Sequence, residues 1–156
     1  MKTIENTRFG NLTYDENMII TFPEGLIGFP RDNHFILIER VKGPVSYLQS
    51  IDSPWLALPV LDGSAILPSY PNMTTEKVAA LIGARIESLA IMVVVTVVAG
   101  ALRANLLAPI LIDAEKRTAI MNEIRVKRPQ EWARYHTSIT RSLKDFHRLG
   151  FCISSD

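Results

Sequence analysis

The sequence has a single cysteine, Cys152, so it cannot form an internal disulfide. Such a chain is typical of a reducing compartment, because secreted domains of this size often carry paired cysteines. The first ten residues, MKTIENTRFG, also lack the apolar stretch of a secretion signal. We therefore expect a cytoplasmic protein.

Long apolar runs are equally scarce. The only membrane candidate is residues 88–102 (SLAIMVVVTVVAGAL), which are uncharged over 15 residues. A helix that crosses a bilayer needs about 20 such residues, and β-branched valine favours a strand. The segment therefore predicts a long strand rather than a membrane span.

The common motifs of catalysis are missing as well. The sequence has no glycine-rich phosphate loop, no Gly-x-Ser-x-Gly elbow and no paired-histidine helix motif. His136 and His147 would lie roughly 16 Å apart on one helix, too far to share a metal ion. Cys152 could act as a nucleophile only with a general base nearby, and His147 is the sole candidate base next to it in the sequence. A lone thiol is more often an inert apolar residue. We therefore expect no catalytic site, no metal site and no cofactor. The alternative of a small hydrolase on a β-barrel is supported by no motif in the sequence.

The charges that are present divide unevenly along the chain. The 156 residues carry a net charge of +1. Residues 1–124 hold 10 Lys/Arg and 13 Asp/Glu (10 − 13 = −3), whereas residues 125–156 hold 7 and 3 (7 − 3 = +4). We therefore expect a mildly acidic body, 1–124, that forms one core, and a basic extension, 125–156.

The body reads as a series of short strands with one helix. Residues 8–14 and 18–22 predict a hairpin, and residues 74–86 have the spacing of a short helix. Pro59 places the strand at 55–61 at an edge or in a bulge. The other expected strands are 35–39, 45–51, 89–98, 107–113 and one more within 112–124. The pattern predicts a mostly β fold, a small antiparallel barrel-like domain or a sandwich.

The extension has the pattern of a basic amphipathic helix. Its apolar residues recur at steps of three or four and share one helical face: Trp132, Tyr135, Ile139, Leu143, Phe146 and Leu149. A tight basic cluster at 125–128 fits contact with RNA, and such a helix also fits self-docking or oligomerisation. The sequence leaves these alternatives open.

The stretch RANLLAPILI, residues 103–112, interrupts an apolar run with a charge and an amide. Arg103 to Asn105 could be an ordinary turn with the following leucines in the core. A strand end that meets another protein would equally use an amide for hydrogen bonds and a leucine as an apolar anchor.

Several segments, in their order along residues 7–113, resemble the flagellar assembly factor FliW family. The most specific are Phe22-Pro23-Glu24-Gly25-Leu26 with Gly28-Phe29, then Leu48-Gln49-Ser50 with Asp52, and Ala104 to Ile110. The resemblance implies a barrel-like, non-catalytic protein of the bacterial cytoplasm. It implies two protein partners, flagellin and CsrA, an RNA-binding translational regulator that FliW-like proteins antagonise.

If the resemblance holds, the partners should be bound by apolar loop residues and by the interrupted strand. The expected contact residues are Leu26, Ile27, Phe29, Arg103, Asn105, Leu106, Leu107 and Pro109. The alternative function is an RNA-contacting module that uses the basic C-terminal helix.

Overall fold

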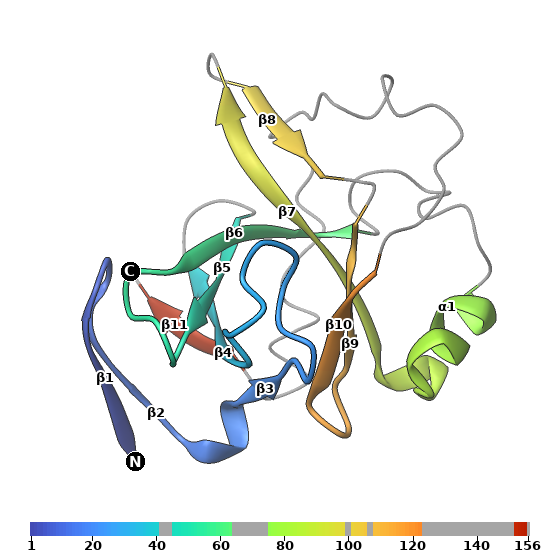
Figure 1. Cartoon of the computed structure of the whole chain (residues 1–156), viewed down its shortest axis with the longest axis horizontal. Coiled ribbons are helices and arrows are strands. Elements are labelled where there is room, and N and C mark those ends of the chain that lie inside the picture. The colour runs from blue at the N-terminus through green and yellow to red at the C-terminus, as the bar shows by residue number, and fades with distance from the viewer. Residues whose placement is uncertain (41–44, 64–74, 99–100, 106–107, 123–151, 156) are drawn as a thin grey trace.

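Seven strands close into a barrel. The computed structural model describes residues 1–40, 45–63, 75–98, 101–105, 108–122 and 152–155 (Figure 1). Around the barrel the strands follow one another in the order β4 (His34–Arg40), β3 (Ile20–Thr21), β10 (Thr118–Met121), β9 (Ile110–Asp113), β7 (Leu89–Val98), β6 (Ala57–Asp62) and β5 (Ser46–Ser50). β5 then pairs with β4 and closes the ring. The expected mostly β, barrel-like fold is confirmed.

One junction of the ring is different from the rest. All neighbouring strands of the barrel are antiparallel except β3 and β10, which are parallel and meet at Thr21 and Thr118. The Thr21 amide donates to the Arg117 carbonyl oxygen over 2.9 Å at this junction. This short contact completes the ring.

The barrel interior is filled by side chains that alternate along the strands. On β4, Phe35 and Leu37 enter the main core, whereas Ile36 points to the opposite face and packs with Ile4 and Tyr14. The main core continues through the other strands with Ile20, Leu48, Val60, Met92, Ile110 and Ile112. β4 is therefore buried on both faces, which explains its continuous apolar run.

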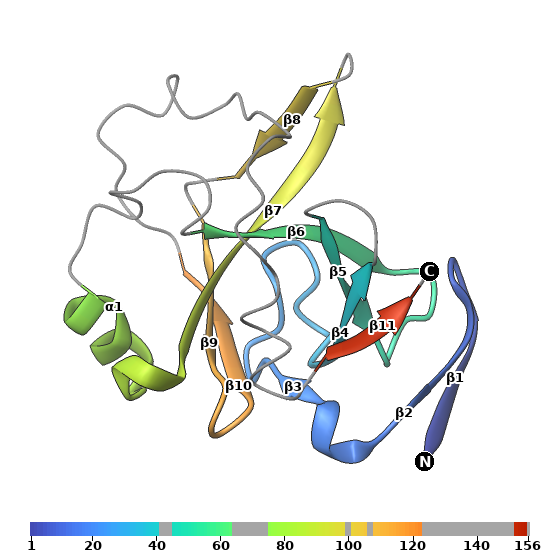
Figure 2. The same ribbon diagram turned by 180° about the vertical axis from the view of Figure 1, so that it is seen from behind.

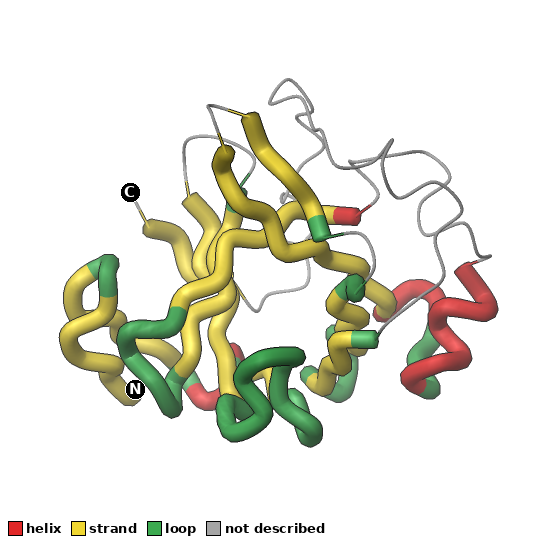
Figure 3. The backbone as a smooth tube through the Cα atoms, turned by 45° about the horizontal axis from the view of Figure 1, so that its top comes forward, coloured by secondary structure: helices red, strands yellow, loops and turns green. Residues whose placement is uncertain are grey.

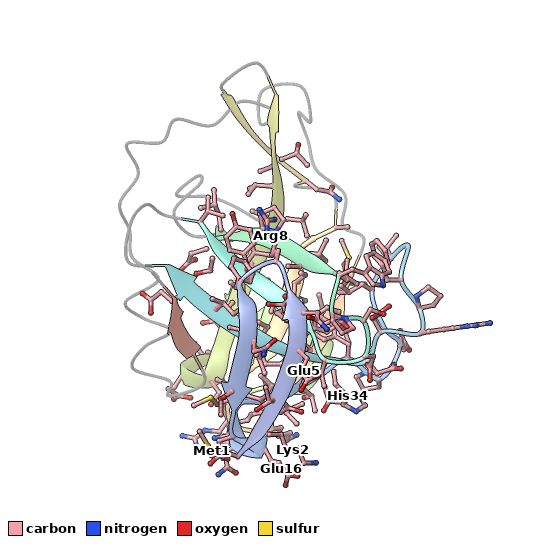
Figure 4. The ribbon with its side chains drawn as sticks, turned by 90° about the vertical axis from the view of Figure 1, so that its left-hand side faces the viewer. Met1, Lys2, Glu5, Arg8, Glu16 and His34 are labelled. Atoms are coloured by element: carbon pink, nitrogen blue, oxygen red, sulfur yellow. The ribbon has the colours of Figure 1, made fainter. Side chains whose placement is uncertain are left out.

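A hairpin covers the outer face of β4. It consists of β1 (Lys2–Thr7) and β2 (Gly10–Tyr14), which form a separate two-stranded sheet (Figures 1 and 4). At its tip the Arg8 guanidinium lies 5.4 Å from the Phe9 ring centre and 5.0 Å from that of Tyr47, on β5. The hairpin is thus fixed to the barrel by an apolar layer and by this cation–π contact.

The expected pairing of residues 8–14 with 18–22 is wrong. Asp15 caps a short 3-10 helix, η1 (Glu16–Met18), by accepting a hydrogen bond from the Asn17 amide. The chain turns away at that point, so β2 pairs with β1 and β3 joins the barrel instead. The low apolar content of KTIENT concealed β1, in which Ile4 is the one aliphatic residue.

The remaining expectations have mixed outcomes. The helix is present but shorter, α1 (Thr75–Ile82), and a 3-10 turn, η3 (Ile86–Ser88), leads into β7. Pro59 does not mark an edge, because β6 pairs with both β5 and β7; the β7 pairing begins at Val60, just after the proline. The apolar segment at 88–102 forms β7 and begins the unexpected β8 (Ala101–Ala104), which pairs with it.

The structure ends with one further strand. β11 (Cys152–Ser155) lies parallel to β4 and places Cys152 opposite Leu37. The expected amphipathic helix of the extension lies outside the described residues. Figure 2 shows β11 from behind, beside β4. Within the described part of the chain, no helix is long and apolar enough to span a bilayer.

Candidate functional site

A compact loop joins β3 to β4. Within residues 22–34, Leu26 and Phe29 exchange two backbone hydrogen bonds of 3.1 and 2.9 Å. Gly25 has a φ of +69°, and a β-carbon there would lie 2.6 Å from the Pro30 carbonyl oxygen. Gly25 therefore satisfies two demands at once, a left-handed backbone and a close backbone contact.

A second loop, residues 51–56, is bonded to the first. The Asp52 carboxylate accepts hydrogen bonds from the Asn33 and His34 amides, at 3.0 and 3.1 Å, and lies 3.3 Å from the His34 ring nitrogen Nδ1. Partial burial acts to raise the pKa of Asp52, but the two amide donors and the His34 ring outweigh it and hold the pKa below its ordinary value. The charged form of Asp52 thus joins the two loops.

A buried hydroxyl forms a second connection between the loops. Ser50 Oγ donates to the Asp32 carboxylate over 2.6 Å and accepts from the Ser53 amide over 2.9 Å. Ser50 and Asp32 are both buried. Since burying a carboxylate is costly unless it is hydrogen-bonded, this contact favours one arrangement of the two loops.

The two loops together present apolar side chains to solvent. Ile27 is 51% exposed and Trp55 is 70% exposed, and the half-buried Phe29 ring lies 6.1 Å, centre to centre, from the Trp55 ring. We call Ile27, Phe29 and Trp55 the Trp55 platform. In Figure 4 the two loops lie side by side near the labelled His34, and Figure 3 draws the loops of the barrel in green.

The interrupted strand at residues 103–112 forms a second surface feature. β8 pairs Ala104 with Val95, and the Asn105 amide donates to the Val94 carbonyl oxygen over 2.8 Å. β9 then pairs with β7 from Ile110, which lies opposite Met92. Along β7 the neighbouring strand thus changes from β8 at Val95 to β9 at Met92.

Comparisons with known proteins agree on one family. The FliW family model, described as "FliW protein", matches residues 3–121. This chain belongs to the FliW family. The flagellar assembly factor FliW of Geotalea uraniireducens is 34% identical over 119 residues, which cover 74% of this chain and 73% of the relative.

Other comparisons extend the match. Flagellar assembly factor FliW 2 of Desulfotalea psychrophila is 34% identical over 125 residues, which cover 77% of this chain and 81% of the relative. A crystal structure of the flagellar assembly factor FliW superposes with a TM-score of 0.70 at 24% identity, covering 87% of this chain and 96% of that one. The barrel is therefore the fold of the FliW family.

The structure separates the expected contact residues of this FliW-family chain into three groups. Ile27 and Asn105 are exposed and Phe29 is half-buried, so these side chains can reach a partner. Leu26 and Pro109 are buried, which corrects the expectation of direct contact for them: Leu26 belongs to the barrel core, and the Pro109 carbonyl accepts a hydrogen bond from the Asn122 amide. Leu106, Leu107 and the side chain of Arg103 lie outside the described residues.

Sequence reasoning missed Trp55 as a surface residue. The predicted strand at 55–61 begins at Trp55, whereas β6 begins at Ala57 and Trp55 lies in the preceding turn. The Asp52-Ser53-Pro54 turn just before it was the available signal. A strand assignment that began after the turn would have left the tryptophan on a loop.

Few side chains among the described residues are placed for metal binding or acid–base chemistry. No group of three or more His, Cys, Asp or Glu side chains in that part of the chain is arranged to hold a metal ion. His34 and Asp52 form a pair whose visible role is to join two loops.

Proposed function

We propose that this FliW-family chain is a cytoplasmic, non-enzymatic regulatory protein that binds a CsrA-like RNA-binding regulator and also binds flagellin. Its relatives are named flagellar assembly factors, and the family match over residues 3–121 is the observation that carries the proposal. The two partners are those that the family resemblance implies. In this role the chain couples the amount of flagellin to its translation.

The proposed mechanism is linked binding. When free flagellin is abundant, it occupies the chain, and the CsrA-like regulator stays on its messenger RNA. When flagellin has been secreted, the chain is free to remove the regulator. Such coupling requires that each partner lowers the affinity for the other by the same factor.

The exposed side chains of two surface features support binding of this kind. Ile27 and Phe29 offer apolar area on rigid loops, and Asn105 offers an amide at the end of β8. Apolar anchors beside directional polar groups are the usual composition of a protein interface. We retain Arg103, Leu106 and Leu107 as further candidates in the same segment.

Size-exclusion chromatography tests the proposal directly. The purified chain is mixed at micromolar concentration with a CsrA homologue, with flagellin, and with both. We expect a complex with each partner alone, and added flagellin should release the CsrA homologue. Failure to retain either partner contradicts the proposal, and simultaneous binding without mutual effect contradicts the linkage.

A matched pair of variants locates the contact. Asn105→Ala should weaken partner binding with little change in melting temperature, because the side chain is exposed and the backbone amide keeps its bond to Val94. Asn17→Ala is the control, since Asn17 is also exposed and its recorded hydrogen bond uses the backbone amide. Equal binding by the two variants would remove Asn105 from the interface.

A further inference from the structure

We propose that the Trp55 platform is the docking surface for an apolar segment of a partner polypeptide that carries lysine or arginine beside its apolar side chains. The inference rests on the proposed function, because it assigns the site and the chemistry of one partner contact. It adds a residue, Trp55, that neither the sequence motifs nor the family match singled out.

The first support is the placement of exposed apolar side chains. In the described part of the chain the large apolar residues with high exposure are Met1, Ile27, Trp55, Leu81 and Ile86. Two of these five stand on loops that are bonded to each other, and Phe29 connects them by its ring contact with Trp55. A buried tryptophan removes on the order of 200 Å² from water, so an indole left 70% exposed leaves most of that gain for a partner.

The second support is the rigidity of the loops beneath these side chains. Both connections, through Ser50 to Asp32 and through Asp52 to the Asn33 and His34 amides, join the loop of Ile27 to the loop of Trp55. A surface whose geometry is fixed before binding loses less conformational entropy when a partner arrives. Rigid aromatic anchors of this kind are the residues that most often dominate binding energy.

The third support is charge, which selects the partner. Across residues 22–34 and 51–56 the cationic side chain is the exposed Arg31, and the carboxylates are the exposed Glu24 and Asp52 and the buried Asp32, so the two loops carry 1 − 3 = −2. Glu24 is exposed and makes no hydrogen bond or ion pair to another described residue. A carboxylate-rich segment would be repelled here, whereas lysine or arginine would be attracted.

Fluorescence tests this chemistry. The chain has two tryptophans, so the Trp132→Phe variant leaves Trp55 as the single indole reporter. The probes are two tryptophan-free amphipathic peptides of equal length, one of leucine and lysine and the other of leucine and glutamate. We expect the leucine–lysine peptide to shift Trp55 emission to shorter wavelength and the leucine–glutamate peptide to have no effect.

Matched substitutions distinguish binding at the Trp55 platform from nonspecific binding of the peptide elsewhere on the chain. In the Trp132→Phe background, Ile27→Ser and Glu24→Lys should each weaken binding of the leucine–lysine peptide. The affinity should fall about tenfold for Ile27→Ser. The controls are Leu81→Ser, which removes a side chain of similar exposure from α1, and Glu76→Lys, which makes the same charge change on that helix. Equal binding of the two peptides, or equal effects of control and platform variants, overturns the inference.

Trp55→Ser in the otherwise natural chain separates this inference from the proposed function. If the natural chain retains flagellin or a CsrA homologue and Trp55→Ser binds about tenfold more weakly with an unchanged melting temperature, the inference is supported. Retention of the partner with equal affinity overturns the inference alone. If the natural chain retains neither protein, the proposed function fails, and the peptide experiment still decides the platform.

Sedimentation of the chain alone excludes a second copy as the occupant. We expect the natural chain and Trp55→Ser to have the same oligomeric state. A dimer that dissociates on this substitution would show that the platform pairs two copies of the chain, and it would overturn the assignment to a different partner.

Discussion

Replacement of Gly25 by alanine should destabilise the barrel by two separable effects. At a φ of +69° an alanine adopts a left-handed backbone, at a cost of about 1–2 kcal/mol. Its β-carbon would also approach three backbone atoms of Pro30 at 2.6–2.7 Å. Forcing apart a packed contact adds about 1–3 kcal/mol, so the free energy of unfolding should fall by about 3 kcal/mol.

Gly28→Ala supplies the matched control. Gly28 lies in the same loop at a φ of +91°, but a β-carbon there meets no atom within 4 Å. Only the backbone cost applies, about 1–2 kcal/mol. In a domain of this length the melting temperature changes by about 2–4 °C per kcal/mol, so Gly25→Ala should melt roughly 10 °C below the natural chain and Gly28→Ala clearly less.

Urea denaturation followed by circular dichroism measures both variants. The slope of the transition should be unchanged while the midpoint falls, since the surface exposed on unfolding is the same. Equal midpoints for Gly25→Ala and Gly28→Ala would refute the reasoning, because they would show that the close approach to Pro30 contributes nothing beyond backbone conformation.

Three further predictions concern the contacts around the loops and the hairpin. Ser50→Ala should lower the free energy of unfolding by about 1–3 kcal/mol, because the buried Asp32 carboxylate loses its hydroxyl donor, whereas Ser53→Ala should have little effect. Equal urea midpoints for those two variants would contradict this account. The lowered pKa of Asp52 means that its charge stabilises the fold fully above the ordinary value of 3.8 and progressively less as the pH falls through the lower folded value. The stability difference between the natural chain and Asp52→Asn should therefore shrink on acidification below pH 3.8, and a difference that grows there would be inconsistent with it. Arg8→Ala should cost about 0.5–1 kcal/mol through loss of the cation–π contact, and Arg8→Lys should restore part of it; identical melting curves for all three proteins would rule the contact out as a source of stability.

The strands with a strong apolar pattern could be predicted from the sequence. β7 spans residues 89–98 as expected, and β4 and β5 each differ from their expected ranges by one residue at both ends. These segments are rich in residues that fit a pleated, buried surface, so local preference and tertiary packing agree. The barrel-like, mostly β class followed from them.

The elements that were missed depend on contacts far along the chain. β1 has little apolar content of its own and is a strand because it pairs with β2 and covers Ile36. β8 was concealed within the apolar run, since Arg103 and Ala104 read as a turn when the pairing with β7 is unknown. β11 is paired with β4, a strand more than a hundred residues earlier.

The candidate site could be predicted only in part, because it too depends on contacts between segments that are far apart in the sequence. The Phe22–Phe29 motif lies in a loop that carries the exposed Ile27. Whether Leu26 or Ile27 faces the core depends on the backbone hydrogen bonds between Leu26 and Phe29, which the pattern of the sequence does not reveal. Trp55 joins the site through the contact between two loops, which no local pattern describes.

The parallel junction between β3 and β10 has a consequence for the motions of the barrel. Every other pair of neighbouring strands in the ring is held by at least two register pairs, whereas this junction has Thr21 and Thr118 alone. Local opening takes the least free energy where the fewest bonds must break. The cylinder should therefore part first along this seam, and in hydrogen exchange the Thr21 amide should be labelled well before the central amides of β4 and β5.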